Sequence, residues 1–197
     1  MKRRILLSIL FVASVLFGRN EAKAQSFGIK TNLLYDATTT LNLGVEIGLA
    51  PKWTLDISGN YNGWEEFPDK LIKHAMVQPE FRYWFCDRFS RHFLGFHAIG
   101  GIYNVGNIIN DFKVGSLDFS PLTNQRFEGW GAGAGISYGY AFILGKHWNL
   151  ELQLGAGYIY TEYDKFQCVK CGKRLESDVT YHYFGPTKAN IGLVYLF

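Results

Sequence analysis

The last seven residues of the chain, 191–197, constrain its fold more than any other segment. Apolar side chains stand at every second position counted back from the terminal Phe197. In a soluble domain such a segment would be an edge strand ending in solvent, which is prone to aggregation. It therefore needs a strand to pair with and apolar surroundings for the outer side chains Ile191, Leu193, Tyr195 and Phe197.

The same two-residue period recurs upstream. In residues 41–49 every odd position is aliphatic and every even one is polar or Gly, and residues 53–62 and 148–158 repeat the pattern. Such alternation predicts β-strands with one apolar face. With the less regular segments included, we expect eight strands, over residues 27–36, 41–50, 53–62, 74–85, 92–104, 127–142, 148–161 and 182–197.

These segments are near or above the ~9–11 residues that a tilted strand needs to cross a bilayer. A mean hydropathy of −0.03 is compatible with this, because only alternate residues of a membrane barrel face lipid. A final strand ending in Phe also resembles the signal by which the barrel-assembly machinery recognises outer-membrane proteins. The predicted fold is all-β: an eight-stranded antiparallel up-and-down transmembrane β-barrel of the outer-membrane type.

The N-terminus predicts export. A basic start, Lys2-Arg3-Arg4, precedes an apolar stretch over 5–18, and residues 22–24 (Ala-Lys-Ala) fit a cleavage site. The stretch is shorter than the ~20 residues of a membrane helix. We therefore expect residues 1–24 to be a cleaved signal peptide and residues 25–197 to form a single domain. Cleavage lowers the net charge from +3 to about −1, so the basic pI of 8.7 is no argument for nucleic-acid binding.

Connection lengths predict the orientation. Turns near 51–52, 86–91 and 144–147 are short, whereas 63–73, 105–126 and 162–181 are long. Outer-membrane barrels have short periplasmic turns and long extracellular loops, so both termini are expected in the periplasm. Aromatic residues on the apolar parity fall at both strand ends and predict two interfacial girdles: Trp53, Phe85, Phe142, Trp148 and Phe197 on the periplasmic side, with Tyr35, Tyr61, Trp130 and Tyr160 on the other.

Alternation alone does not decide which face points outward. A soluble lipocalin-like barrel or a periplasmic sandwich would bury the apolar face instead. The polar face, however, carries few charges, and these are of both signs, as expected for an interior ion network. Its members would be Lys30, Glu46, Asp56, Glu80, Arg82, Glu151 and Lys188, with Trp84 on the same parity near the periplasmic rim. A lumen filled in this way would not conduct solutes.

Glycines invite two further predictions. Gly129, Gly131, Gly133, Gly135 and Gly139 share one face of the expected strand 127–142. They leave room for large side chains that arrive from across the lumen, or alternatively allow a sharp bend; we favour the first. Gly100-Gly101 is a candidate β-bulge in the strand 92–104.

Cys168 and Cys171 form a C-x-x-C motif in the last long connection. Such a motif is a redox pair, half a zinc site or a loop disulfide. A redox pair needs a helix N-terminus, and zinc needs two more ligands, for which His182 alone is insufficient. Outside the inner membrane a disulfide is the favoured interpretation. Cys86 is expected at the opposite rim as a free thiol.

No catalytic constellation, metal site or cofactor motif is predicted. The five histidines are spread over both rims and several strands: His74, His92, His97, His147 and His182. The glycine pattern over 131–139 alternates as a strand and opens no helix, so it is no phosphate loop. We therefore predict a non-enzymatic protein.

Several motifs resemble a known family. They are residues 27–36 (FGIKTNLLYD), 80–84 (EFRYW), 103–104 (YN), Cys168 with 171–172 (CG), and 183–188 (YFGPTK). The chain looks similar over its mature length to domain of unknown function 3575, a family common in Bacteroidota. The resemblance implies an outer-membrane location and an eight-stranded barrel without an assigned activity. Some relatives appear beside fimbrial or surface-assembly functions.

Three function hypotheses follow. In the first, the barrel presents the loops 63–73, 105–126 and 162–181 to a surface or fimbrial protein. Ile108, Ile109, Phe112, Leu117 and Phe119 suit such contact, or else only pack their loop onto the barrel. In the second, the barrel is a lipid-modifying enzyme that uses a histidine near the rim. In the third, the barrel is a narrow solute channel. Outer-membrane lipid is an expected partner in all three, and nucleic acid in none.

Overall fold

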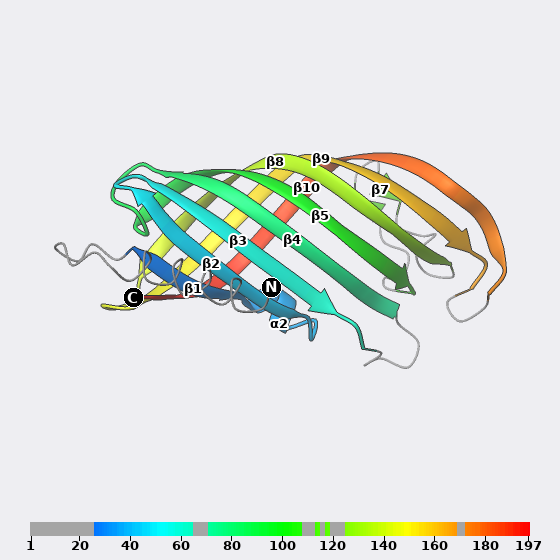
Figure 1. Cartoon of the computed structure of the whole chain (residues 1–197), viewed down its shortest axis with the longest axis horizontal. Helices are drawn as coiled ribbons and strands as arrows, with labels where there is room; N and C mark the ends of the chain where they lie inside the picture. The colour runs from blue at the N-terminus through cyan, green and yellow to red at the C-terminus, as the bar shows by residue number, and fades with distance from the viewer. Residues whose placement is uncertain (1–25, 65–70, 108–112, 115–116, 119–124, 169–171) are drawn as a thin grey trace, which may run out of the picture.

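The computed structural model describes residues 26–64, 71–107, 113–114, 117–118, 125–168 and 172–197. The predicted signal peptide, residues 1–24, lies outside this part. Eight long strands make up most of it (Figure 1): β1 (Phe27–Asn32), β2 (Leu41–Ala50), β3 (Trp53–Asn62), β4 (Leu71–Trp84), β5 (Arg91–Gly106), β8 (Arg126–Ile143), β9 (Trp148–Phe166) and β10 (Arg174–Leu196). A short helix, α2 (Leu33–Asp36), follows β1, and β6 (Lys113–Val114) pairs with β7 (Leu117–Asp118) as a separate ribbon.

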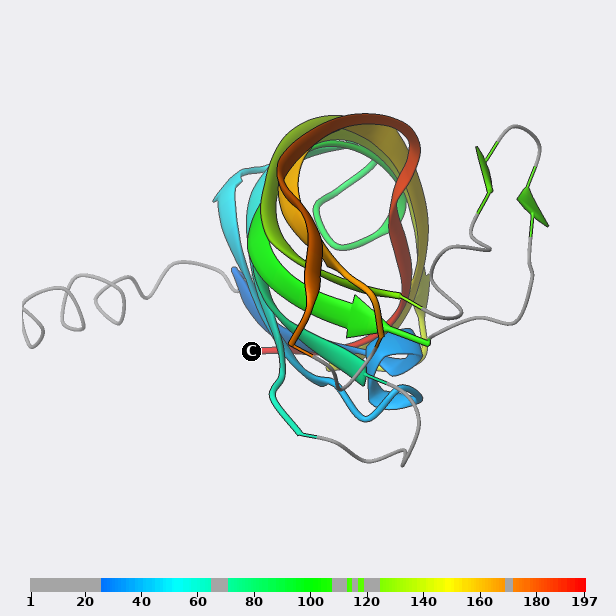
Figure 2. The same cartoon turned by 90° about the vertical axis from the view of Figure 1, so that its right-hand side faces the viewer.

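The eight strands form one closed antiparallel sheet in which each strand pairs with its neighbour in the chain (Figure 2). The ring closes between β1 and β10, where Gly28 pairs with Leu196 and Asn32 with Gly192. This confirms the predicted all-β class with eight antiparallel strands. We call the end of the barrel at Phe27 and Phe197 the terminal end. We call the opposite end, at Asn62, Gly106 and Arg126, the hairpin end.

The predicted first strand is too long by four residues, because 33–36 turn into α2. The cause is local: the side chain of Asn32 accepts a hydrogen bond from Leu34 N at 3.1 Å and caps the helix. The backbone N–H of Ala37 then donates to Leu33 O at 3.0 Å. This turn brings Tyr35 over the lumen instead of into an outer girdle, since its hydroxyl lies 3.9 Å from Met76 Sδ.

The predicted loop 162–181 is mostly strand. β9 and β10 remain paired well past the expected ends, from Tyr181↔Thr161 to Arg174↔Phe166. Two register shifts, between Arg174 and Val179, interrupt this pairing without ending it. We call this paired segment, residues 161–166 and 174–181, the β9–β10 extension. β8 pairs with its β9 strand as far as Arg126↔Phe166, and its far end reaches beyond the ends of β4 and β5 (Figure 1).

The predicted bulge at Gly100-Gly101 is absent from β5. These residues pair with Val77 and Met76 in one continuous register. Bulges or irregularities lie instead between Gly48 and Ala50, in the β2–β3 pair, and between Pro186 and Lys188 in β10.

The glycines of β8 serve two purposes. At Gly139 a Cβ would come within 2.3 Å of the Phe93 ring, and at Gly135 within 2.8 Å of His97 Nε2. The large side chains thus come from the adjacent strand β5 and not, as expected, from across the lumen. At Gly129 and Gly133 a Cβ would meet backbone carbonyl oxygens of β9 at 2.2 Å. There glycine permits close backbone approach, a reason that neither prediction had given.

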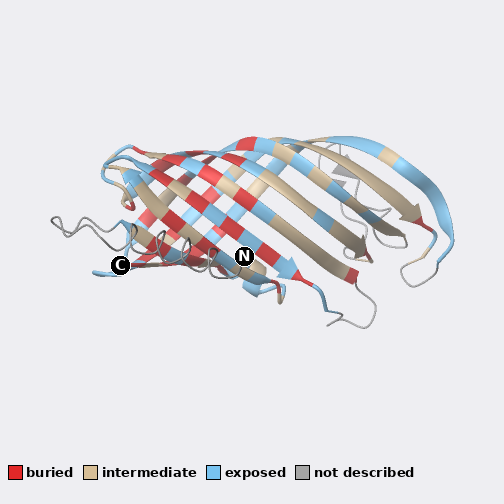
Figure 3. Ribbon diagram, in the orientation of Figure 1, coloured by how far each residue is buried: buried red, intermediate tan, exposed pale blue. Residues whose placement is uncertain are grey.

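The barrel is polar inside and apolar outside. Glu46, Arg82 and Glu151 are fully buried, whereas Leu154 and Ile136 are 73% and 69% exposed. Buried positions alternate along the strands and gather in the half near the terminal end (Figure 3). Among the described residues, no helix is both long and apolar enough to cross a membrane.

Candidate functional site

The interior of the terminal half holds a network of ion pairs centred on Arg82 of β4. Its Nε lies 2.7 Å from Glu80 Oε2, and its Nη2 lies 3.0 Å from Asp56 Oδ2. Its Nη1 lies 2.7 Å from Glu46 Oε2 and 3.1 Å from Glu151 Oε2. Four carboxylates from β2, β3, β4 and β9 thus converge on one guanidinium group.

Two lysines complete the network. Lys30 of β1 bonds to Glu46 and lies 3.4 Å from both Asp56 Oδ2 and Glu151 Oε2. Lys188 of β10 lies 2.9 Å from Glu80 Oε2 and 3.7 Å from Asp56 Oδ2. The structure therefore brings together all seven residues expected in the interior. Pairing of this kind offsets much of the desolvation cost of buried charge.

Neutral side chains that sequence reasoning missed extend the network. Gln153 accepts from Arg82 Nη2 at 3.0 Å and donates to Glu80 at 2.7 Å, and Ser137 also donates to Glu80. Thr54 donates to Glu46 at 2.5 Å. Gln153 continues the inward parity of Asn149 and Glu151, so the alternation could have identified it. Ser137 lies on the glycine-rich face of β8, where no charge drew attention to it.

His97 of β5 is a further residue of the network that was not predicted from the sequence. Its Nε2 lies 2.9 Å from Thr187 Oγ1, and its Nδ1 lies 3.9 Å from Glu80 Oε1. His97 sits in β5, which alternates poorly in sequence, so its inward direction was not apparent. The other four histidines are not gathered with it.

Below the network, an apolar cluster seals the terminal end. Trp84 packs on Phe93 and Phe89 with ring centroids 4.6 and 6.0 Å apart, and its Nε1 donates to Thr54 at 2.9 Å. Val194 and Leu196 of β10 and Ala141 join the cluster. Trp84 was expected near this rim, whereas the inward apolar residues of the tail were not.

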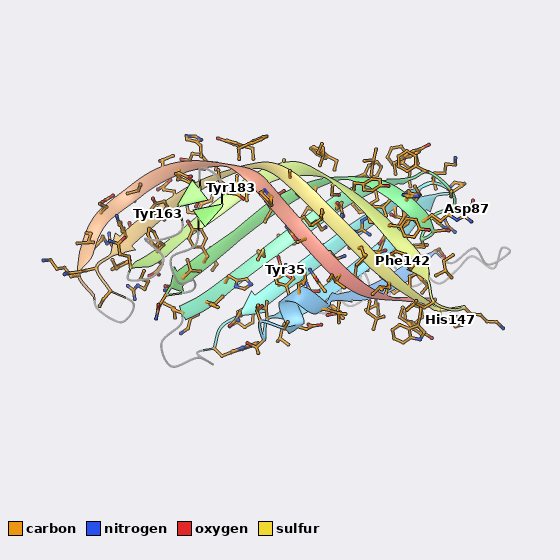
Figure 4. The ribbon with its side chains drawn as sticks, turned by 180° about the vertical axis from the view of Figure 1, so that it is seen from behind. Tyr35, Asp87, Phe142, His147, Tyr163 and Tyr183 are labelled. Carbon is orange, nitrogen blue, oxygen red and sulfur yellow. The ribbon has the colours of Figure 1, made fainter. Side chains whose placement is uncertain are left out.

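Above the network, toward the hairpin end, the lumen contains a cavity. Its volume is about 350 Å³, and it lies between β4, β5, β8, β9 and β10. Tyr35 from α2 lies between the two regions, because it lines the charged floor beside Lys30 and Lys188 and contacts His74 and Met76 of the cavity. Figure 4 shows Tyr163 and Tyr183 at this end, with Asp87, Phe142 and His147 at the opposite one.

Apart from Tyr35, which lies over the lumen, the outer surface carries the expected aromatic residues. At the terminal end Trp53 stacks on Phe81 at 4.8 Å, and Trp148 meets Tyr195 edge-on at 5.0 Å. Toward the hairpin end Trp130 packs on Tyr160 at 5.7 Å. The tail residues Ile191, Leu193, Tyr195 and Phe197 all point outward, opposite the buried Val194 and Leu196.

The β9–β10 extension has a different, charged surface. Arg174 lies 3.3 Å from Asp164, and Lys165 lies 3.6 Å from Glu176. Burial raises the pKa of Tyr163, and the nearby Glu176 carboxylate raises it further. Of the predicted contact loops, residues 65–70, 108–112, 115–116, 119–124 and 169–171 lie outside the described part.

Cys168 and Cys86 differ in bonding state, as expected. Cys168 is disulfide-bonded, and Cys86 is free in the turn after β4. Cys171, the predicted partner of Cys168, lies outside the described residues. Within the described residues no group of three or more His, Cys, Asp or Glu side chains could hold a metal ion.

The chain matches a known family model. A family model described as "protein of unknown function (DUF3575)" covers residues 7–197 of the chain. No curated protein and no solved structure matches the chain.

Proposed function

The chain belongs to the DUF3575 family of proteins of unknown function, and from that premise we propose that it is a non-enzymatic outer-membrane barrel. Its lumen is closed to solutes, both termini are periplasmic, and the hairpin end meets a partner at the cell surface. The observation that carries the proposal is the inversion of the barrel, with charges buried and leucines exposed.

The inversion argues against a soluble barrel. A soluble protein buries its apolar face, because burial of apolar surface is the main favourable term in folding. Here Leu41, Leu43 and Leu154 are 62–73% exposed, while Lys30 and its carboxylate partners are buried. A continuous apolar outer wall is stable only when lipid covers it.

The distribution of outward charges supports a membrane boundary. The outward positions of β3 and β9 carry no charge between Trp53 and Tyr61 or between Trp148 and Tyr160, both of which the structure describes in full. Charged side chains begin with Glu162 in β9. The apolar zone is bordered by aromatic residues at both ends, as interfacial girdles require.

The packing of the lumen supports a role other than conduction. Arg82 and Trp84 are fully buried and occupy successive layers of the terminal half. An eight-stranded barrel is only wide enough for side chains to fill its interior. A solute would have to displace both the ion network and the Trp84 cluster.

The β9–β10 extension supports a surface role. It projects past the other strands with its own ion pairs (Figure 1). Among the described residues, no strand pairs with the other edge of its β10 strand, because β1 reaches β10 only from Gly192 to Leu196. An accessible edge and a charged face suit contact with another protein, and a fimbrial or other surface component is the proposed partner.

Thiol labelling of whole cells tests orientation. A membrane-impermeant maleimide should label Cys86 only after the outer membrane is permeabilised, because this free thiol lies at the terminal end. In a Cys86→Ser background, Glu176→Cys should be labelled on intact cells. Labelling of Cys86 on intact cells would contradict the proposed orientation.

A pull-down tests the surface role. Extracts from cells that carry the wild-type barrel should yield a co-purifying surface protein, and the charge reversal Arg174→Glu should reduce its recovery. The matched control is Arg88→Glu, at the opposite end. Unchanged recovery with Arg174→Glu would rule out the charged extension as the contact. The lipid profile of a deletion strain tests the enzyme hypothesis. A changed profile, reproduced when one of the histidines is substituted, would favour the enzyme instead.

A further inference from the structure

The cavity above the ion network has the features of a small-molecule site. Its volume of about 350 Å³ lies at the lower end of the ~300–1,000 Å³ typical of ligand pockets. Its walls are mostly apolar, formed by Met76, Ile99 and Ile159, with tyrosines at the mouth, and Gly131 leaves one wall flat. Pockets of this kind bind by shape and apolar contact and use a few polar atoms for orientation.

One polar atom in this wall lacks a partner. His74 Nε2 is buried and makes no hydrogen bond to any described residue. A neutral imidazole has one N–H and one acceptor nitrogen. In the tautomer with the N–H on Nδ1, Nε2 is an acceptor, and none of the described residues donates to it.

Three other hydroxyl groups of the lining are already paired. The hydroxyls of Tyr103 and Thr161 bond to each other at 2.6 Å, and the Tyr183 hydroxyl donates to Pro186 O at 3.0 Å. In the network below, Lys30 is paired with Glu46, and Arg82 with Glu80. Among the described residues that line the cavity, none offers a charged ligand a counter-ion, and desolvation would oppose its entry.

From these contacts we propose that the cavity binds a small, uncharged aromatic molecule carrying one hydroxyl or N–H group, which donates a hydrogen bond to His74 Nε2. The ring lies against the flat wall at Gly131, between Ile99 and Ile159. The ion network and the Trp84 cluster fill the lumen on the terminal side, so we place the route of entry at the hairpin end. The site needs only the folded barrel, so it does not depend on the surface partner proposed above.

2-Naphthol, which is fluorescent and neutral, is a suitable probe for the refolded barrel in detergent. Naphthalene lacks the donor, and 2-naphthalenesulfonate carries a charge. We expect saturable binding of 2-naphthol, about tenfold weaker binding of naphthalene, and no binding of the sulfonate. Partition into the detergent alone would be non-saturable, and that result would overturn the proposal.

Two variants locate the site. At Gly131 an added Cβ has only ordinary contacts, the nearest at 3.4 Å, so Gly131→Leu should fold and fill the cavity. The matched control is Gly100→Leu, on the outer face, where an added Cβ meets nothing within 4 Å. Binding should fall more than tenfold in the first variant and stay unchanged in the second. Equal binding by both would overturn the proposal.

His74→Phe tests the hydrogen bond. This variant should bind 2-naphthol about tenfold more weakly and naphthalene as the wild type does. A heat-modifiable gel shift confirms that each variant is folded before binding is measured. Unchanged affinity for 2-naphthol in His74→Phe would overturn the proposed donor contact and with it the ligand class.

Discussion

Phe197 and Phe27 meet at the seam where the barrel closes. Their ring centroids are 5.5 Å apart, and Phe197 N donates to Phe27 O at 3.0 Å. The last residue of the chain is therefore a structural part of the seam, joined to the first strand by a backbone hydrogen bond and by ring contact. Tyr195 packs edge-on against the Phe197 ring at 4.9 Å, so the outer side of the seam is a short aromatic row.

Removal of Phe197 should impair assembly. The deletion takes away the final backbone bond and both ring contacts, and it also removes the terminal aromatic residue by which we expect the chain to be recognised. The amount of heat-modifiable barrel in the outer-membrane fraction should fall severalfold. Phe197→Trp keeps an aromatic end and serves as the control. Full surface expression of the deletion would contradict both roles.

Arg82→Met should strongly destabilise the barrel. The substitution leaves Glu46, Asp56, Glu80 and Glu151 with only two lysines, and removal of one partner from a buried ion pair costs about 3–5 kcal/mol. Urea titration of the refolded barrel measures the loss in the free energy of unfolding. Arg174→Met is the matched control, because its exposed pair with Asp164 is worth less than about 1 kcal/mol. Equal losses would mean that the network adds nothing specific.

Gly139→Ala should destabilise the terminal end. A Cβ at this position would lie 2.3 Å from Phe93 Cζ, and that ring is held against Trp84 in the cluster. Overpacking of this kind costs about 1–3 kcal/mol. Gly59→Ala, where a Cβ meets nothing within 4 Å, should leave the urea midpoint unchanged. A neutral effect of Gly139→Ala would show that the Phe93 ring moves freely.

Alternation predicts strand position well where one face is wholly apolar. The ends of β2 and β3 agree with the prediction to the residue, because Leu41 to Leu49 and Trp53 to Tyr61 keep the period without interruption. The same parity identified Lys30, Arg82 and the other charged residues of the network. Their convergence follows from barrel closure, which places every inward residue within a few ångströms of the axis.

Each prediction that the structure corrected failed for a physical reason. The four residues of α2 are too few to show a helical period, and their shape depends on the Asn32 cap. Glu162 and Asp164 resemble loop residues, yet they occupy strand because β9 extends beyond the apolar zone. Val194 and Leu196 were not recognised as interior, because the tail is apolar on both faces and alternation carries no contrast there. The cavity near His74 arises from neighbouring strands and has no signature along any one of them.

Leu154→Arg separates a membrane barrel from a soluble one. Leu154 is 73% exposed in the middle of β9, opposite Tyr138 and Ala189. In lipid vesicles an arginine facing the middle of the bilayer should cost about 2–4 kcal/mol, whereas on a soluble surface its effect would be within about 0.5 kcal/mol. Leu175→Arg, in the charged extension, is the matched control and should be neutral because the extension lies outside the apolar zone. Urea unfolding in vesicles measures both variants. If Leu154→Arg is also neutral there, its outer face does not contact lipid, and the membrane proposal fails.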